Sequence, residues 1–256
     1  MLHSIKGLHG HNLEAIDGRI GHVHAFYFDD NTWRVRYVVI DTGTWLPGRR
    51  VLISPTALGH NSTEAHELTV NLSREQIEHS PDIDTDQPVS RQHEMALHEY
   101  YEWPVYWGAL VPAGAGEAAL PPPAIADAEA SEQADPTLRS TLEVIDYYIH
   151  ARDGDLGHVA DFLVDDESWS IRYLVIDTRN WCPGKKVLVA PEWITEVSWG
   201  EAKVSVDLTQ EEIKNSPTFD PSVPLQRDYE AQLFDHYDRP TYWSSRGKGA
   251  EESGEA

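Results

Sequence analysis

One sequence pattern occurs twice in this chain, and this repeat constrains the fold more than any other feature. Residues 33–55 read WRVRYVVIDTGTWLPGRRVLISP, and residues 169–191 read WSIRYLVIDTRNWCPGKKVLVAP. Each residue of the second copy lies 136 positions after its counterpart, so that Trp33 corresponds to Trp169 and Asp41 to Asp177. A repeat at one fixed offset predicts two copies of one structural unit. The length of 256 residues allows each copy a core of its own.

The segments outside the repeat predict the domain boundaries. We expect the first domain at residues 1–108 and the second at residues 137–243. Residues 109–136 are rich in Ala, Pro, Gly and acidic residues and lack an apolar period, which is typical of a linker. Residues 244–256 are polar and rich in Gly and Glu, so we expect a disordered tail.

The apolar pattern of each copy predicts mainly β structure. In the first copy we expect strands at residues 20–28, 33–40 and 50–54, with a polar turn at residues 29–32 that bonds its own backbone. The strand at residues 67–72 alternates between polar and apolar side chains, as does its counterpart in the second copy.

Turn and cap signals divide these segments. Pro47-Gly48 and Pro183-Gly184 predict type II turns, since glycine adopts a positive φ without strain. Ser73 to Gln76 and Thr209 to Glu212 fit the capping box of a short helix.

A second helix is expected after each capping box, at residues 90–102 and 226–238. His93, Leu97 and Tyr101 lie at helical spacing, which predicts that this face packs against the domain. The second copy has Tyr229, Leu233 and Tyr237 in the same positions. Each copy then ends in an aromatic segment.

Composition excludes several classes of protein. The net charge of −23 disfavours nucleic acid as a partner and favours basic or metal-bearing partners. The one cysteine, Cys182, provides neither a disulfide framework nor a thiolate metal site, and it aligns with Leu46 as a small apolar residue. The sequence lacks a secretion signal and an apolar stretch long enough to span a membrane. We therefore expect a cytoplasmic protein without membrane insertion.

The repeated pattern G-H-V…F…D-D…W…R-Y…V-I-D-T…W-P-G…V-L…P resembles the PRC-barrel family over residues 10–107 and 146–243. The resemblance implies two tandem small β-barrels, each followed by short helices. It also implies a non-enzymatic adaptor role, as in the reaction-centre H subunit and the ribosome maturation factor. The family has no common catalytic residues, so the resemblance supplies none.

Two sets of residues are candidates for contacts with proteins. The loop between the strands expected at residues 33–40 and 50–54, with its counterpart in the second copy, offers an aromatic side chain beside a cation. This is a common interface anchor, or else a lid over the barrel: Trp45 and Arg49, then Trp181 and Lys185. We expect the two barrels of the chain to pair, with the aromatic tails at the contact between them. The alternative is that each tail packs on its own barrel. The tail residues are Tyr106, Trp107, Tyr242 and Trp243.

Catalytic and metal sites are less well supported. His22 and His24 lie on one face of a predicted strand, and His158 repeats His22, so a small metal- or ligand-binding protein is the alternative function. Asp82, Asp84 and Asp86 imitate a calcium loop without its glycine and its final glutamate.

Asp41 and Asp177 could act as bases, although bonds to loop amides fit their position at strand ends better. Because the sequence contains no catalytic motif, a hydrolytic enzyme ranks third. We expect a non-catalytic scaffold that needs no cofactor and binds a protein partner that the sequence does not identify.

Overall fold

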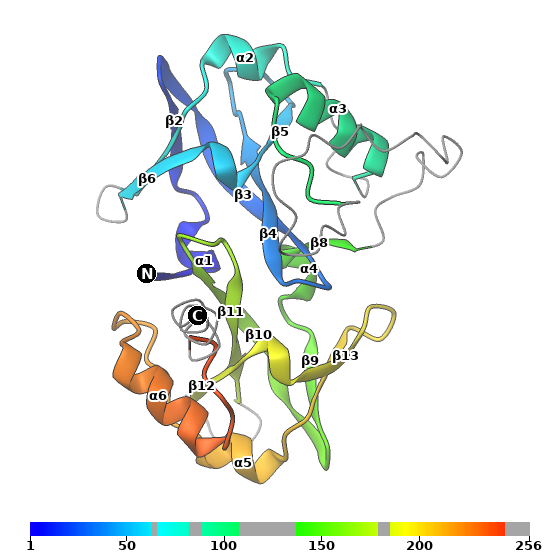
Figure 1. Cartoon of the computed structure of the whole chain (residues 1–256), viewed down its shortest axis with the longest axis vertical. Helices are drawn as coiled ribbons and strands as arrows, with labels where there is room; N and C mark the ends of the chain where they lie inside the picture. The colour runs from blue at the N-terminus through cyan, green and yellow to red at the C-terminus, as the bar shows by residue number, and fades with distance from the viewer. Residues whose placement is uncertain (63–65, 82–88, 108–136, 179–184, 244–256) are drawn as a thin grey trace, which may run out of the picture. The chain divides into compact units, whose positions relative to one another are not determined.

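The computed structural model describes residues 1–62, 66–81, 89–107, 137–178 and 185–243. The chain forms two compact units. The N-terminal unit is Leu8–Ser140, and the C-terminal unit combines Met1–Gly7 with Thr141–Ala256. Each unit contains one seven-stranded sheet and a few short helices, so the predicted fold class, mainly β with two similar domains, is confirmed (Figure 1).

The strands of the N-terminal unit lie in the order β5-β4-β3-β2-β7-β6, with β8 paired to β3. All pairs are antiparallel except β2 with β7. The strands are β2 (Asn12–Ala15), β3 (Gly18–Asp29), β4 (Arg34–Asp41), β5 (Arg50–Ile53), β6 (Leu58–Ser62), β7 (Glu67–Val70) and β8 (Leu138–Ser140). The helices are the 3-10 turn η1 (Pro55–Ala57), α2 (Arg74–Glu78) and α3 (Arg91–Tyr101).

The C-terminal unit repeats this sheet in the order β12-β11-β10-β9-β14-β13, with β1 paired to β10. Its strands are β1 (Leu2–Ser4), β9 (Tyr148–Ala151), β10 (Gly154–Asp165), β11 (Ile171–Asp177), β12 (Lys186–Val189), β13 (Ile194–Ser198) and β14 (Lys203–Val206). Its helices are α4 (Thr141–Val144), the 3-10 turn η2 (Pro191–Trp193), α5 (Gln210–Asn215) and α6 (Arg227–His236). The short helix α1 (Ile5–Leu8) lies where the chain passes from one unit to the other.

The local signals of the sequence act as expected where the structure describes them. Both capping boxes form, at Ser73 and at Thr209. Asp29 accepts the backbone amides of the turn that follows β3, at 3.0 and 3.2 Å. Gly48 has a φ of 77°, and Arg49 N–H donates to the Leu46 carbonyl at 3.0 Å, which confirms the turn at Pro47-Gly48. Pro183-Gly184 lies outside the described residues.

Helix α3 packs along β4 and β5 in the N-terminal unit (Figure 1). Leu97 joins a buried cluster with Tyr37 and Val39 of β4 and Leu52 of β5. The buried face of α3 is rotated from the predicted one: His93 is exposed, whereas Glu94 is completely buried. Because of this rotation, the Glu94 carboxylate lies between α3 and the sheet, where an apolar side chain is ordinarily expected.

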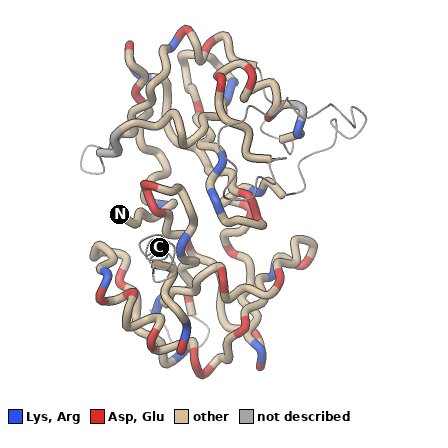
Figure 2. The backbone as a smooth tube through the Cα atoms, in the orientation of Figure 1, with Lys and Arg blue, Asp and Glu red and all other residues tan. Residues whose placement is uncertain are grey.

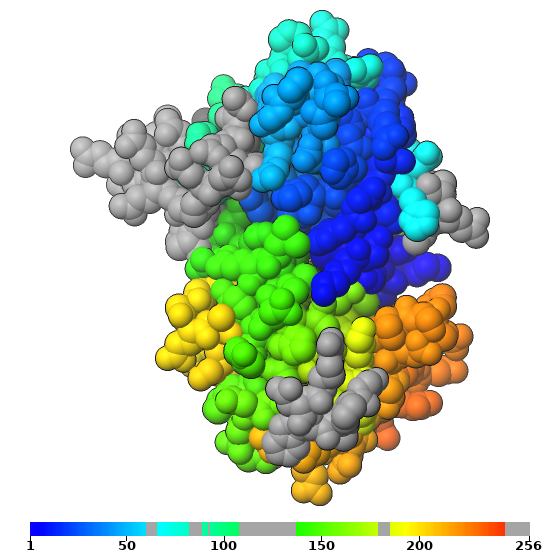
Figure 3. All heavy atoms as spheres, turned by 180° about the vertical axis from the view of Figure 1, so that it is seen from behind, coloured from blue at the N-terminus to red at the C-terminus, as the bar shows by residue number. Residues whose placement is uncertain are grey.

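Acidic residues outnumber basic ones, with 43 Asp and Glu against 20 Lys and Arg, and both kinds occur along each unit (Figure 2). Some apolar side chains of the C-terminal unit are exposed as well. Leu142 and Tyr148 are 43% and 57% exposed, and the segment that carries them lies at the surface in the view of Figure 3, where it is green.

Candidate functional site

A buried glutamate links helix, sheet and aromatic tail in the N-terminal unit. Glu94 of α3 accepts a hydrogen bond from the Tyr37 hydroxyl of β4 at 3.0 Å. The same carboxylate oxygen accepts the hydroxyl of Tyr106 from the tail. The other oxygen pairs with Arg91, one helical turn earlier, at 3.0 Å. Two donors and one cation therefore compensate a carboxylate that is withdrawn from water.

The C-terminal unit contains the same arrangement 136 residues later. Glu230 of α6 accepts the hydroxyls of Tyr173 at 2.8 Å and Tyr242 at 2.9 Å. Its second oxygen pairs with Arg227 at 3.0 Å. The two networks therefore share the glutamate, both tyrosines and the arginine at the repeat offset.

The pKa shifts of the two buried tyrosines fit a structural role for these networks. Burial, followed by the nearby Glu94 charge, raises the pKa of Tyr37 far above its ordinary value. Burial and Glu230 do the same to the pKa of Tyr173. Both hydroxyls stay protonated and donate to the carboxylates. Because each carboxylate is already engaged by two hydroxyls and an arginine, it is poorly placed to take a proton from a substrate.

The predicted aromatic tails lie next to these networks. Arg36 lies 3.9 Å from the centre of the Tyr106 ring, and Arg91 lies 4.5 Å from that of Trp107. The equivalent contacts of the C-terminal unit are 4.5 Å from Arg172 to Tyr242 and 4.3 Å from Arg227 to Trp243. Each tail thus packs beside the helix of its own unit. A seam between the barrels at these rings stays a prediction.

The two cations of the predicted interaction surface donate hydrogen bonds to carbonyl groups at helix ends. Arg49 donates to the Glu78 carbonyl at 2.6 Å and to the carbonyl and hydroxyl of Ser80, just after α2. Lys185 donates to the carbonyls of Lys214 and Ser216 at the end of α5. Cations placed on terminal carbonyls stabilise a helix end.

Of the two tryptophans of that surface, the structure describes one. Trp45 is half-buried, and the guanidinium of Arg74 lies 4.7 Å from its ring centre. Trp181 lies outside the described residues, as do Cys182 and the three aspartates of the calcium-like pattern. The binding role of this surface stays a prediction.

The histidine strand does not assemble ligands for a metal. His22 and His24 lie on β3, and His158 lies on β10 with Nε2 4.0 Å from a carboxylate oxygen of Asp146. Within the described ranges, no group of three or more His, Cys, Asp or Glu side chains is arranged to hold an ion. Asp41 accepts the Gly43 amide at 2.8 Å, which agrees with its expected role at the end of a strand.

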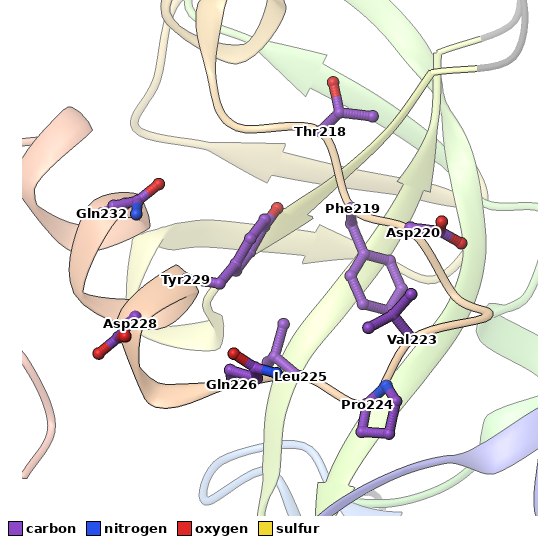
Figure 4. A pocket seen from close by; sticks show the side chains of 10 residues that line it. All are labelled: Thr218, Phe219, Asp220, Val223, Pro224, Leu225, Gln226, Asp228, Tyr229 and Gln232. Atoms are coloured by element: carbon purple, nitrogen blue, oxygen red, sulfur yellow. The ribbon is translucent and has the colours of Figure 1, made fainter.

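A pocket of about 370 Å³ lies at the start of α6 in the C-terminal unit (Figure 4). The loop before α6 forms one wall, and the outer side of the first turns of the helix forms the other. Sequence reasoning missed it, because its walls come from a loop without periodicity. Its lining residues are Thr218, Phe219, Asp220, Val223, Pro224, Leu225, Gln226, Asp228, Tyr229 and Gln232.

The pocket has an aromatic floor and an acidic edge. The Phe219 and Tyr229 rings meet edge to face at 6.4 Å, and the Tyr229 hydroxyl donates to the Pro217 carbonyl at 2.9 Å. Asp220 accepts the hydroxyl and amide of Ser222 at 2.6 and 2.9 Å. These bonds lower the pKa of Asp220, so its carboxylate is ionised at neutral pH. Among the described residues that line the pocket, two are aspartates and none is a cation.

Comparison with known protein families identifies a domain in the first half of the N-terminal unit. The family model of the PRC-barrel domain matches residues 13–77, from β2 to α2, so a PRC-barrel domain is present there. None of the curated proteins compared with the chain matches it. Among the described helices, none is long and apolar enough to cross a membrane.

Proposed function

We propose that the chain is a non-catalytic interaction module with two PRC barrels, and that the pocket at α6 holds a basic segment of a partner protein. The observation that carries the proposal is the composition of the pocket. Phe219 and Leu225 supply apolar surface, whereas Asp220 and Asp228 supply negative charge at the edge. Such a site suits a peptide in which an apolar side chain is flanked by Lys or Arg.

The assignment of a second PRC barrel rests on the repeat. The C-terminal unit has the strand order of the matched unit, and its pairs have the same directions. The non-catalytic part is supported by the buried glutamates, because tyrosine hydroxyls and an arginine already engage each carboxylate. A reducing, cytoplasmic location belongs to the proposal too, and the single cysteine supports it.

The overall charge supports a basic partner. A net charge of −23 attracts cationic segments over a distance and repels acidic ones. The pocket adds short-range selection, because a ligand must also place an apolar group against Phe219 and Tyr229. We expect binding to weaken with salt, since the edge carboxylates are exposed and are therefore screened.

The test uses an array of twelve-residue peptides with Leu or Phe at the centre, in basic versions and in charge-inverted versions. The full chain should bind a subset of the basic peptides and none of the acidic ones. For the best peptide, Asp228→Lys should weaken binding by roughly tenfold, because the change reverses an edge charge.

Asp235→Lys is the matched control. Asp235 lies exposed on the same helix but outside the pocket. The two variants therefore change the net charge equally, and only Asp228→Lys changes the pocket. Equal weakening by both variants would mean that only overall charge attracts the peptides, and the pocket would lose its assigned role.

A further inference from the structure

Two three-residue strands join the sheet of the unit that the other repeat builds. Strand β1 precedes the first repeat but pairs with β10 in the C-terminal unit. Strand β8 precedes the second repeat but pairs with β3 in the N-terminal unit. We call β1 and β8 the donor strands, and the edges of β10 and β3 the acceptor edges.

The two pairings are the same at the repeat offset. Leu2 lies opposite Asp165, as Leu138 lies opposite Asp29. The backbone contacts agree as well: Asp166 N–H donates to the Met1 carbonyl at 3.1 Å, and Asp30 N–H donates to the Thr137 carbonyl at 2.8 Å. Each acceptor edge is therefore in register with a donor of the same kind.

In each donor strand one side chain contacts the aspartate that directly follows the acceptor strand. His3 Nε2 lies 3.0 Å from Asp166 Oδ2, and Arg139 Nε lies 3.4 Å from Asp30 Oδ2. These four side chains are between 9% and 28% exposed, so water screens them only in part. Leu138 also packs against the buried cluster of the N-terminal unit. The acceptor edge thus selects an aliphatic residue followed by a basic or imidazole side chain.

We propose that the acceptor edges also take donor strands from a second copy of this chain, which gives a strand-exchanged dimer. The donor already leaves its own repeat, so exchange between copies preserves every contact and changes only which chain supplies the strand. Domain swapping of this kind has a low energetic cost, because both forms have identical local structure. A strand of three residues also has few backbone bonds to break.

The connection within the chain favours the monomer at ordinary concentration. The predicted linker at residues 109–136 joins the repeats, and a linker of such length gives an effective concentration in the millimolar range. We therefore expect dimers when copies refold together at high concentration, and we expect these dimers to persist on dilution while both donors stay bound.

Charge reversal at the β8 contact tests the exchange directly. The first variant is Arg139→Glu, which has a mismatched donor and a native acceptor. The second is Asp30→Arg, which has a native donor and a mismatched acceptor. In a mixed dimer each donor faces a matched acceptor, whereas each variant alone has only mismatched pairs. The variants are refolded together and separately, one of them labelled with ¹⁵N, and native mass spectrometry counts the dimers.

We expect the mixed dimer to exceed either same-variant dimer by roughly tenfold, because like charges on paired strands are destabilising. The doubly substituted chain, Arg139→Glu with Asp30→Arg, is matched within itself and should be as monomeric and as folded as the wild type. No excess of mixed dimer, with a folded double variant, would overturn the proposal. An unfolded double variant would overturn it too, since the contact would then not be interchangeable.

Discussion

The two units show how one scaffold tolerates differences around a fixed buried core. Both contain a glutamate held by two tyrosine hydroxyls and an arginine. They differ at the first tyrosine: His98 bonds the Tyr37 hydroxyl, whereas Phe234, at the equivalent position, packs its ring against that of Tyr173. The arginine side chain is 27% exposed in the N-terminal unit and 57% exposed in the C-terminal unit. The same network is therefore more enclosed in the N-terminal unit.

The largest expected effect comes from removing the arginine. Arg91→Met removes the cation that pairs with the buried Glu94, which should cost about 3 kcal/mol in the N-terminal unit. Arg227→Met should cost about half as much, because water can replace a more exposed guanidinium. Hydrogen exchange of α3 and α6 in the full chain reports the two losses separately. Equal losses would contradict the difference in enclosure, and Arg91→Met combined with Glu94→Gln should recover part of the stability.

The turn before β5 should show the next largest effect. Gly48 has a left-handed backbone, so Gly48→Val should destabilise the N-terminal unit by about 2 kcal/mol through strain. Gly200→Ala in the C-terminal unit is the control, because an added Cβ there meets no atom within 4 Å and the backbone is not left-handed. Urea unfolding measures both variants. A Gly48 variant as stable as the control would disprove the turn assignment.

The helix-capping cations should be interchangeable between units. Arg49→Met and Lys185→Met each remove charged hydrogen bonds to terminal carbonyls and should cost about 1 kcal/mol. Arg49→Lys should cost much less, since the lysine at the equivalent position already performs this role in the C-terminal unit. Thermal unfolding ranks the three variants. If lysine were as damaging as methionine, the planar guanidinium itself would be required.

The smallest effect concerns pH and depends on His98. Its Nε2 lies 2.9 Å from the Tyr37 hydroxyl, and burial lowers its pKa below the ordinary value. The unfolded chain thus binds the proton at higher pH than the folded unit does. Stability of the N-terminal unit should fall as pH decreases from about 7 through the unfolded pKa of about 6.5 towards the lower folded pKa.

Substitution of His98 tests whether this histidine makes the stability of the N-terminal unit more dependent on pH than that of the C-terminal unit. His98→Phe should remove part of it by making the N-terminal unit resemble the other, whereas the exposed His93→Phe should leave it unchanged. Hydrogen exchange of α3 at pH 7 and pH 5 gives the comparison. An unchanged slope in the His98 variant would assign the pH dependence to other groups.

Local patterns predicted the parts of the fold that depend on neighbours in sequence. Alternation identified β7 and β14, the capping boxes started α2 and α5, and the turn at Gly48 followed from Pro-Gly. The short strands β1 and β8 were missed, because three residues carry no period and their partners lie more than 100 residues away.

The buried glutamates were missed for a different reason. A glutamate on a helix is ordinarily exposed, so the packed face of α3 was placed at His93 instead of Glu94. The repeat did contain the signal: Arg91 and Glu94 recur as Arg227 and Glu230, together with both tyrosines. Polar identity between copies at one offset would have indicated a shared internal contact. The pocket offers a weaker signal, since only two of its lining residues are identical at the repeat offset: Asp220 to Asp84 and Pro224 to Pro88.

We propose that α6 has two distinct faces: Glu230 and Leu233 hold the fold, while Asp228 and Gln232 contact a basic partner. Chemical-shift mapping of the full chain with the best basic peptide tests it directly. We predict saturable shifts at Phe219, Asp228 and Gln232, with the amides of Glu230 and Leu233 changing least within the helix. Shifts spread evenly over the acidic surface, or confined to another part of the chain, would show that this face of α6 does not bind the peptide.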